Sequence, residues 1–119
     1  MKRDKITISE NTVIVTGSNI WMTEAEIVEL FGTTAAAVSS AIKVIVKSDA
    51  LNDYEVCKCI RLDSGNSADV YNMEVVIALA FRLNTYPASV FRKWLVKRAT
   101  APRRTTPPIV IQYKDGLLN

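Results

Sequence analysis

Residues 23–47 contain two helix-forming segments separated by a short turn, and this spacing constrains the fold more than any other part of the chain. Thr23 followed three residues later by Glu26 is a capping box, the pattern with which helices begin. Gly32 can adopt the left-handed backbone conformation that ends a helix. Between these signals the apolar residues recur at the spacing of one helical face: Ile27, Leu30 and Phe31.

A second helix is predicted to begin at Thr34, which can act as its N-cap, and to run to about Lys47. Its apolar residues share one face: Val38, Ile42 and Ile45. Two helices joined by so short a turn cross steeply, as in a helix-turn-helix, whose second helix enters the major groove of DNA. The opposite face of the second helix is predicted to meet DNA: Thr34, Ala36, Ser39, Ser40, Lys43 and Lys47.

This second helix carries few residues that can identify a base. An arginine bound to guanine through two hydrogen bonds discriminates by about 1–3 kcal/mol. The only cations here are Lys43 and Lys47, and the remaining exposed residues are alanine and serine. We therefore expect modest, largely electrostatic binding, with roughly 4–6 phosphate contacts and a log–log salt slope of roughly −4 to −5.

Short β-branched runs predict strands on both sides of the helix pair. Residues 6–8 and 13–15 flank a polar turn and predict a hairpin before the helices. Residues 56–62 and 68–71 flank the turn sequence 63–67 and predict a second hairpin after them. A hairpin in this second position is the wing of a winged helix-turn-helix.

The C-terminal part predicts two more helices and a tail. Asn72 can cap a helix over residues 73–83, which is apolar almost all round and is therefore expected to be buried. Pro87 suits the first turn of a last helix, with a core stripe of Val90, Phe91, Trp94 and Leu95. The proline-rich residues 102–108 favour an extended tail, followed by a strand-like run at 109–113.

The predicted fold class is thus α+β, mainly α: a winged helix-turn-helix with a short N-terminal β-hairpin, a β-hairpin wing and two C-terminal helices. Residues 1–101 are assigned to this domain and residues 102–119 to the proline-rich extended tail.

The distribution of charge is uneven although the net charge is only +3. Residues 1–74 hold seven Lys and Arg against eleven Asp and Glu, whereas residues 75–114 hold eight basic residues and no acid. This asymmetry fits a surface that meets phosphate, and a solvated helix with a basic tail fits it equally well. The basic residues predicted to support DNA binding outside the second helix are Lys58, Arg61, Arg92, Lys93, Lys97 and Arg98.

The residue types exclude most catalytic chemistry. The chain has no histidine, so Ser-His and Cys-His mechanisms are absent, and a zinc site would lack ligands. Cys57 and Cys59 are two residues apart; on a strand they face the same way and favour free thiols. We expect no enzyme, no metal and no cofactor. No apolar run approaches 18 residues and residues 1–8 have no signal-peptide core, so a cytoplasmic, non-membrane protein is expected.

Four segments, in order and with matching spacing, resemble the RhuM family of bacterial virulence-protein homologues. They are NIWMTEAEIVELFG at 19–32, YEVC at 54–57, YNMEVVIALAFRLN at 71–84 and FRKWL at 91–95. The resemblance spans about residues 19–98. It implies a DNA-binding N-terminal domain, of a kind also found ahead of Fic domains, with a role in transcription regulation or in a mobile element.

The second helix departs from the family pattern. Where that pattern has arginine, this chain has Ala35 and Ser40, which limits sequence-specific readout. An alternative is therefore a protein-interaction or dimerisation module on the same scaffold, because the Ala/Ser face suits close helix–helix contact and residues 109–113 can add to a partner's sheet. The partners expected are double-stranded DNA, and a second copy of the chain or a larger partner protein.

Overall fold

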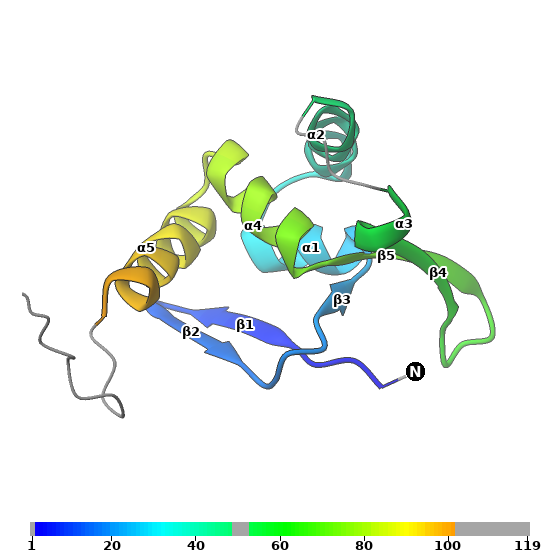
Figure 1. Cartoon of the computed structure of the whole chain (residues 1–119), viewed down its shortest axis with the longest axis horizontal. Helices are drawn as coiled ribbons and strands as arrows, with labels where there is room; N and C mark the ends of the chain where they lie inside the picture. Colours follow the sequence, from blue (N-terminus) through cyan, green and yellow to red (C-terminus); the bar gives the residue numbers. More distant parts are fainter. Residues whose placement is uncertain (1, 49–52, 102–119) are drawn as a thin grey trace, which may run out of the picture.

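The computed structural model describes residues 2–48 and 53–101, which form an α+β, mainly helical fold (Figure 1). The elements follow one another as β1 (Ile6–Ser9), β2 (Thr12–Val15), β3 (Trp21–Met22), α1 (Glu24–Phe31), α2 (Ala35–Ser48), α3 (Asp53–Val56), β4 (Cys57–Arg61), β5 (Ser67–Asn72), α4 (Met73–Arg82) and α5 (Tyr86–Thr100). The tail predicted at 102–119, with its strand-like run, lies outside the described residues.

Two small antiparallel sheets flank the helices. β1 and β2 form the predicted N-terminal hairpin, closed by a two-residue turn at Glu10 and Asn11 between the paired Ser9 and Thr12. The second sheet has the order β3-β5-β4, so the predicted second hairpin is confirmed as β4 and β5. Neither β3 nor α3 was predicted, because segments of two and four residues are too short for any periodicity to show.

α1 and α2 begin and end where the sequence predicts. The Thr23 hydroxyl accepts from the backbone N–H of Glu26 at 3.1 Å, and the Glu26 carboxylate accepts from the backbone N–H of Thr23 at 2.8 Å. Gly32 ends α1 with φ 61° and ψ 46°. The hydroxyl of Thr34 then accepts from the backbone N–H of Ala37 at 3.1 Å, and α2 leaves at 112° to α1.

The core lies where α1, α2, α4 and α5 meet. The predicted apolar face of α2 is buried there, and the Phe31 ring meets the Phe91 ring edge-on at a centroid distance of 5.7 Å. Trp94 stacks on the other side of Phe91 at 5.5 Å. These contacts fix α5 against α1 and leave α2 supported from one side by α1 and α4.

The expectation that α4 is buried is confirmed for one side of the helix and wrong for the other. Val75, Val76, Leu79 and Ala80 are fully buried, but Phe81 on the opposite side is 58% exposed. The reason is that α2, α5 and β5 pack against the inner side of α4, and no element of the described chain covers its outer side (Figure 1).

Within the described residues, no single helix is long and apolar enough to cross a membrane. Only α1 and α2 taken together meet that test of length and composition, and they are bent by 112° at the turn between them.

Candidate nucleic-acid interface

The outward side of α2 is the face predicted to meet DNA. Thr34, Ala36, Ser40, Lys43 and Lys47 are exposed, and Ser39 is partly buried. Val44, 45% exposed, lies on the same side. We call this set of seven residues the α2 face. It contains no acidic residue, so its two ammonium groups meet no opposing charge within the helix itself.

The α2 face is exposed because the apolar residues of α2 that pack into the core lie on the other side of the helix. Val38 and Ile45 are fully buried and Ile42 is 5% exposed. The N-terminus of α2 is set by Thr34, and the preceding Thr33 closes the turn by donating its backbone N–H to the carbonyl of Val28 at 3.2 Å. The local sequence therefore fixes both the position and the rotation of the exposed lysines.

One face of the β4–β5 hairpin lies beside α2. Side chains alternate along a strand, and the pairs Cys57–Tyr71 and Cys59–Asp69 place these residues on one face. A cleft between this face and α2 is lined by Lys43, Lys47, Cys57, Asp69 and Tyr71, together with Ile42 and Val46. Burial, followed by the neighbouring Cys57 and acidic groups, raises the pKa of Tyr71 to about 12, so its hydroxyl stays neutral.

By strand alternation Arg61 shares a face of β4 with Cys57 and Cys59, but it is exposed at the turn end of the strand and lines a groove beside β1, β3 and α1 rather than the cleft beside α2. Lys58 lies on the opposite face, where its Nζ sits 4.0 Å from the centroid of the Trp21 ring. The structure thus brings neither Arg61 nor Lys58 into the cleft that holds Lys43 and Lys47. Because successive side chains of a strand point to opposite faces, the sequence alone already indicates that Lys58 and Arg61 lie on opposite faces of β4.

The basic residues of α5 have different surroundings. Arg92 is partly buried, and its Nη1 donates to the carbonyls of Ala80 at 2.6 Å and Leu83 at 2.9 Å, where it satisfies the C-terminal end of α4. Arg98 lies 5.1 Å from the centroid of the Trp94 ring. Lys93 and Lys97 are exposed. Arg92 therefore has a structural role that its sequence position did not reveal.

α5 as a whole is not beside α2, because α4 lies between them (Figure 1). The first turn of α5 approaches the α1–α2 turn: a Cβ on Gly32 would lie 3.7 Å from Cγ of Pro87. Lys97 and Arg98 follow about three helical turns later, roughly 15 Å further along α5. The structure does not bring these two residues together with Lys43 and Lys47.

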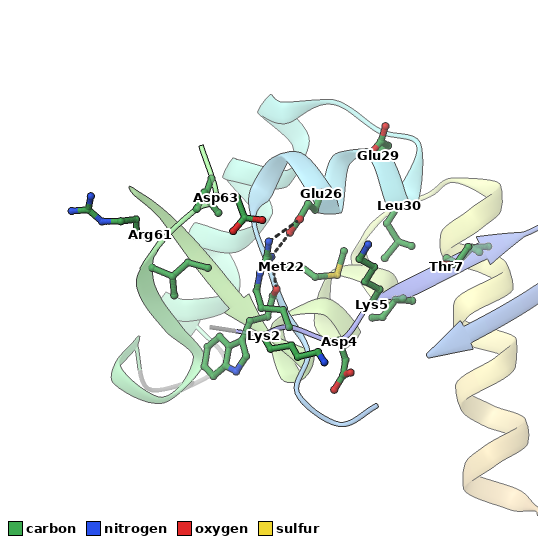
Figure 2. Close-up of a pocket in the computed structure, with 16 residues that line it drawn as sticks. Lys2, Asp4, Lys5, Thr7, Met22, Glu26, Glu29, Leu30, Arg61 and Asp63 are labelled. Atoms are coloured by element: carbon green, nitrogen blue, oxygen red, sulfur yellow. Dashed lines mark hydrogen bonds and ion pairs between the residues drawn. The ribbon is translucent and has the colours of Figure 1, made fainter. Parts of the chain in front are cut away.

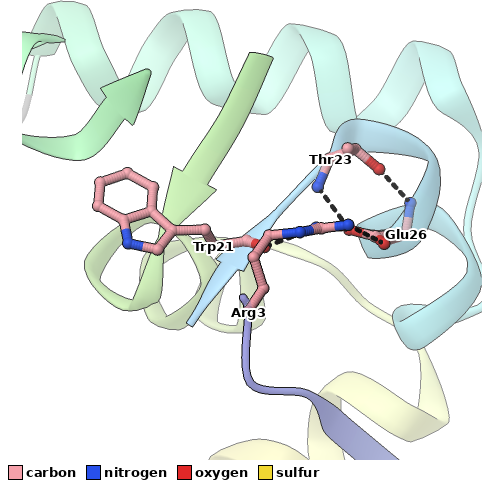
Figure 3. A network of polar contacts seen from close by, with 4 residues as sticks. All are labelled: Arg3, Trp21, Thr23 and Glu26. Atoms are coloured by element: carbon pink, nitrogen blue, oxygen red, sulfur yellow. Dashed lines mark hydrogen bonds and ion pairs between the residues drawn. The ribbon is translucent and has the colours of Figure 1, made fainter. Parts of the chain in front are cut away.

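A network around Arg3 holds the first turn of α1 (Figure 3). Nη1 of Arg3 donates to the carbonyl of Trp21 at 2.8 Å and to Oε1 of Glu26 at 2.7 Å, and Nη2 donates to Oε2 at 3.2 Å. Burial raises the pKa of the Glu26 carboxyl, but the hydrogen bonds from Arg3 and Thr23 and the Arg3 charge outweigh it, and the net pKa is lowered. Sequence reasoning missed Arg3, because no local pattern links residues 23 positions apart.

A groove runs beside this network, between β1, β3, α1 and the end of β4 (Figure 2). Lys5 and Thr7 line one side, Met22 and Leu30 lie deeper, and Arg61 and Asp63 lie at the far end. Its lining holds four basic and four acidic residues: Lys2, Arg3, Lys5 and Arg61 with Asp4, Glu26, Glu29 and Asp63. This balance does not favour a polyanion.

The residues that line the groove and the α2 cleft include no serine and no histidine. Cys57 and Cys59 lie on one face of β4 and are not joined by a disulfide. Among residues 2–48 and 53–101, no group of three Cys, Asp or Glu side chains could hold a metal ion. No family model, curated protein or solved structure matches the chain. Functional inference rests on the α2 face, the hairpin and the groove.

Proposed function

We propose that the chain is a DNA-binding domain of the winged helix-turn-helix type, with α2 as the helix that enters the major groove and the β4–β5 hairpin as the wing. A role of the RhuM kind, in transcription regulation or in a mobile element, follows from the resemblance at residues 19–98. The observation that carries the proposal is the acid-free α2 face, presented at 112° to α1.

The steep bend supports this function because a recognition helix must project from its supporting helix. The small side chains of Ala36 and Ser40 permit close approach of the helix to base edges, and Lys43 and Lys47 supply charge for phosphate. With no arginine on α2, affinity rests mainly on phosphate contacts, and discrimination between sequences is weak.

The test is binding of the full chain to an arbitrary 25-base-pair duplex, followed by fluorescence anisotropy at several salt concentrations. We expect binding at about 50 mM salt with a log–log slope of roughly −4 to −5. The double variant Lys43→Glu with Lys47→Glu should abolish it. The matched control, Lys2→Glu with Lys5→Glu, makes the same change in net charge in the groove and should retain most of the affinity. Equal losses in both double variants would contradict a role for α2.

A second function, a protein-interaction module, is favoured by the open edge of β1. The carbonyl of Lys5 accepts from the N–H of Thr16 at 3.0 Å, so Lys5, Thr7 and Ser9 are the residues bonded to β2. The N–H and C=O groups of Ile6 and Ile8 therefore point away from β2, and both residues line the groove. Outward-pointing N–H and C=O groups at every second residue can pair with an added extended strand. We take this strand to be that of a second copy of the chain.

The variant Ile8→Pro tests the edge, because proline removes an outward N–H without touching a β1–β2 hydrogen bond. If a second copy adds to β1, light scattering should give a dimer for the full chain and a monomer for Ile8→Pro. The control Ile8→Ala removes the same packing and keeps the N–H, so it should remain dimeric. A monomer in the wild type rules this function out.

A further inference from the structure

We propose that the corner between α4 and α5, residues 81–87, is a second nucleic-acid contact that grips the sugar–phosphate backbone beside the N-terminus of α2. This inference rests on the proposed DNA-binding function and adds a contact that the sequence pattern does not single out. We call these seven residues the α4–α5 corner.

The corner adjoins the helix that would enter the groove. A Cβ on Gly32, in the α1–α2 turn, would lie 3.7 Å from Cγ of Pro87 in the corner. Gly32 is followed within two residues by Thr34, the start of the α2 face. In Figure 1 the α4–α5 corner and α2 both lie at the top of the view. A duplex that receives the N-terminal turn of α2 therefore passes next to the corner.

The exposed groups of the corner suit a sugar–phosphate backbone. Arg82 and Asn84 are exposed and can both donate hydrogen bonds to phosphate oxygens. The ring of Tyr86 is 64% exposed and can pack against deoxyribose. No Asp or Glu occurs between residues 75 and 101, so no carboxylate of α4, the corner or α5 beyond Glu74 opposes phosphate.

The corner is also held in place by contacts on its inner side. Nη1 of Arg92 donates to the carbonyls of Ala80 and Leu83, and the hydroxyl of Thr85 accepts from the N–H of Ala88 at 3.3 Å. The hydroxyl of Tyr86 donates to Oδ1 of Asn11 in the β1–β2 turn. Because these contacts order the backbone before binding, little conformational entropy remains to be lost when a ligand arrives.

Backbone contacts made here are independent of base sequence. They fix the register of α2 on the duplex and raise affinity for all sequences alike. This contact adds to those of the α2 face, where Lys43 and Lys47 supply the charge for phosphate.

The experiment measures duplex affinity of the full chain and of Arg82→Ala with Asn84→Ala, on two unrelated 25-base-pair sequences across a salt series. We expect a loss of roughly 5- to 10-fold per phosphate contact near 0.1 M salt, equal for both sequences, and a salt slope smaller in magnitude by about 1. The variant Asn84→Asp, which puts an acid at an exposed position, should weaken binding similarly. Circular dichroism verifies that the variants fold.

Lys97→Ala is the matched control, because it removes a cation from the same helix pair roughly 15 Å beyond the corner. It should bind within about twofold of the wild type. Unchanged affinity in the corner variants, with binding still lost in Lys43→Glu with Lys47→Glu, overturns the corner and leaves the proposed function intact. An equally large loss of affinity in Lys97→Ala assigns the effect to the overall charge of α5, and this outcome also overturns the proposed contact at the corner. No binding by the wild type overturns both.

Discussion

Arg3 and Glu26 form a two-pronged ion pair that joins the N-terminal segment to the first turn of α1. The guanidinium contacts both carboxylate oxygens, at 2.7 Å and 3.2 Å. Because Glu26 also completes the capping box with Thr23, this pair connects the start of α1 to residues that precede β1.

Arg3→Ala should lower the free energy of unfolding by about 1 kcal/mol, a modest value because the Glu26 side chain is 42% exposed. The loss has two parts: the ion pair and the hydrogen bond to the carbonyl of Trp21. Urea denaturation measures it. Lys2→Ala, which removes a neighbouring exposed cation, should leave the free energy of unfolding within about 0.5 kcal/mol of the wild type. An equal loss in Lys2→Ala would show that the effect comes from the net charge of the segment and not from the ion pair.

The same pair should make stability depend on pH in the acid range. The pKa of Glu26 in the folded chain lies below its ordinary value of 4.5. Its stabilising contribution is therefore fully present above 4.5 and is lost as the pH falls through the folded pKa. Urea midpoints measured between neutral pH and pH 3 should fall more steeply for the wild type than for Arg3→Ala, because the variant lacks the cation that favours ionised Glu26. Parallel curves would show that Arg3 does not set this pKa.

Local signals in the sequence predicted the four longer helices, α1, α2, α4 and α5, and both hairpins. The capping box at Thr23, the glycine at 32 and the cap at Thr34 each act within four residues, so pattern alone reveals them. The Arg3–Glu26 pair, the pairing of β3 with β5 and the contact of Arg92 with the end of α4 join residues far apart or without a local motif. These depend on the packed fold, which periodicity does not encode.

The candidate site, like the fold, could be predicted from the sequence only in part. The rotation of α2, and hence the exposure of Lys43 and Lys47, follows from the spacing of Val38, Ile42 and Ile45. Grouping α5 with α2 on charge alone did not foresee that α4 lies between them. A count of charged residues does not say where they lie in space. It therefore could not show that the first turn of α5 is near Gly32 whereas Lys97 is far from it.

Glu10→Gly should stabilise the chain. Glu10 has φ 54°, the only positive φ of a residue other than glycine in the described chain. A side chain there is disfavoured, and glycine relieves the strain at the cost of a more flexible unfolded state, for a net gain of roughly 0.5–1 kcal/mol. Thermal unfolding measures the gain. Glu10→Ala is the matched control: it removes the same carboxylate but keeps a Cβ, and it should show no gain.

Gly32→Ala should cost about 1 kcal/mol, since a Cβ is strained at φ 61° although the space beside Pro87 is open enough for it. Gly32→Asn should cost less, because asparagine tolerates the left-handed conformation better than alanine. The comparison separates backbone strain from contact with the α4–α5 corner. If asparagine, which is larger, is the more harmful of the two, crowding against Pro87 decides the effect. Urea denaturation of the two variants gives the order.

The two cysteines of β4 report on the hairpin, because they share a face but differ in exposure. Cys59 is exposed and Cys57 is partly buried in the cleft beside Lys43 and Lys47, so Ellman's reagent should modify Cys59 first and Cys57 more slowly.

If the hairpin is a wing beside α2, a saturating duplex should slow modification of Cys59 several-fold. The rate for the variant Cys57→Ser isolates that thiol, and urea-unfolded protein with and without duplex controls for effects of DNA on the reagent. An unchanged Cys59 rate in a saturated complex would place the α2-facing side of the hairpin away from the DNA.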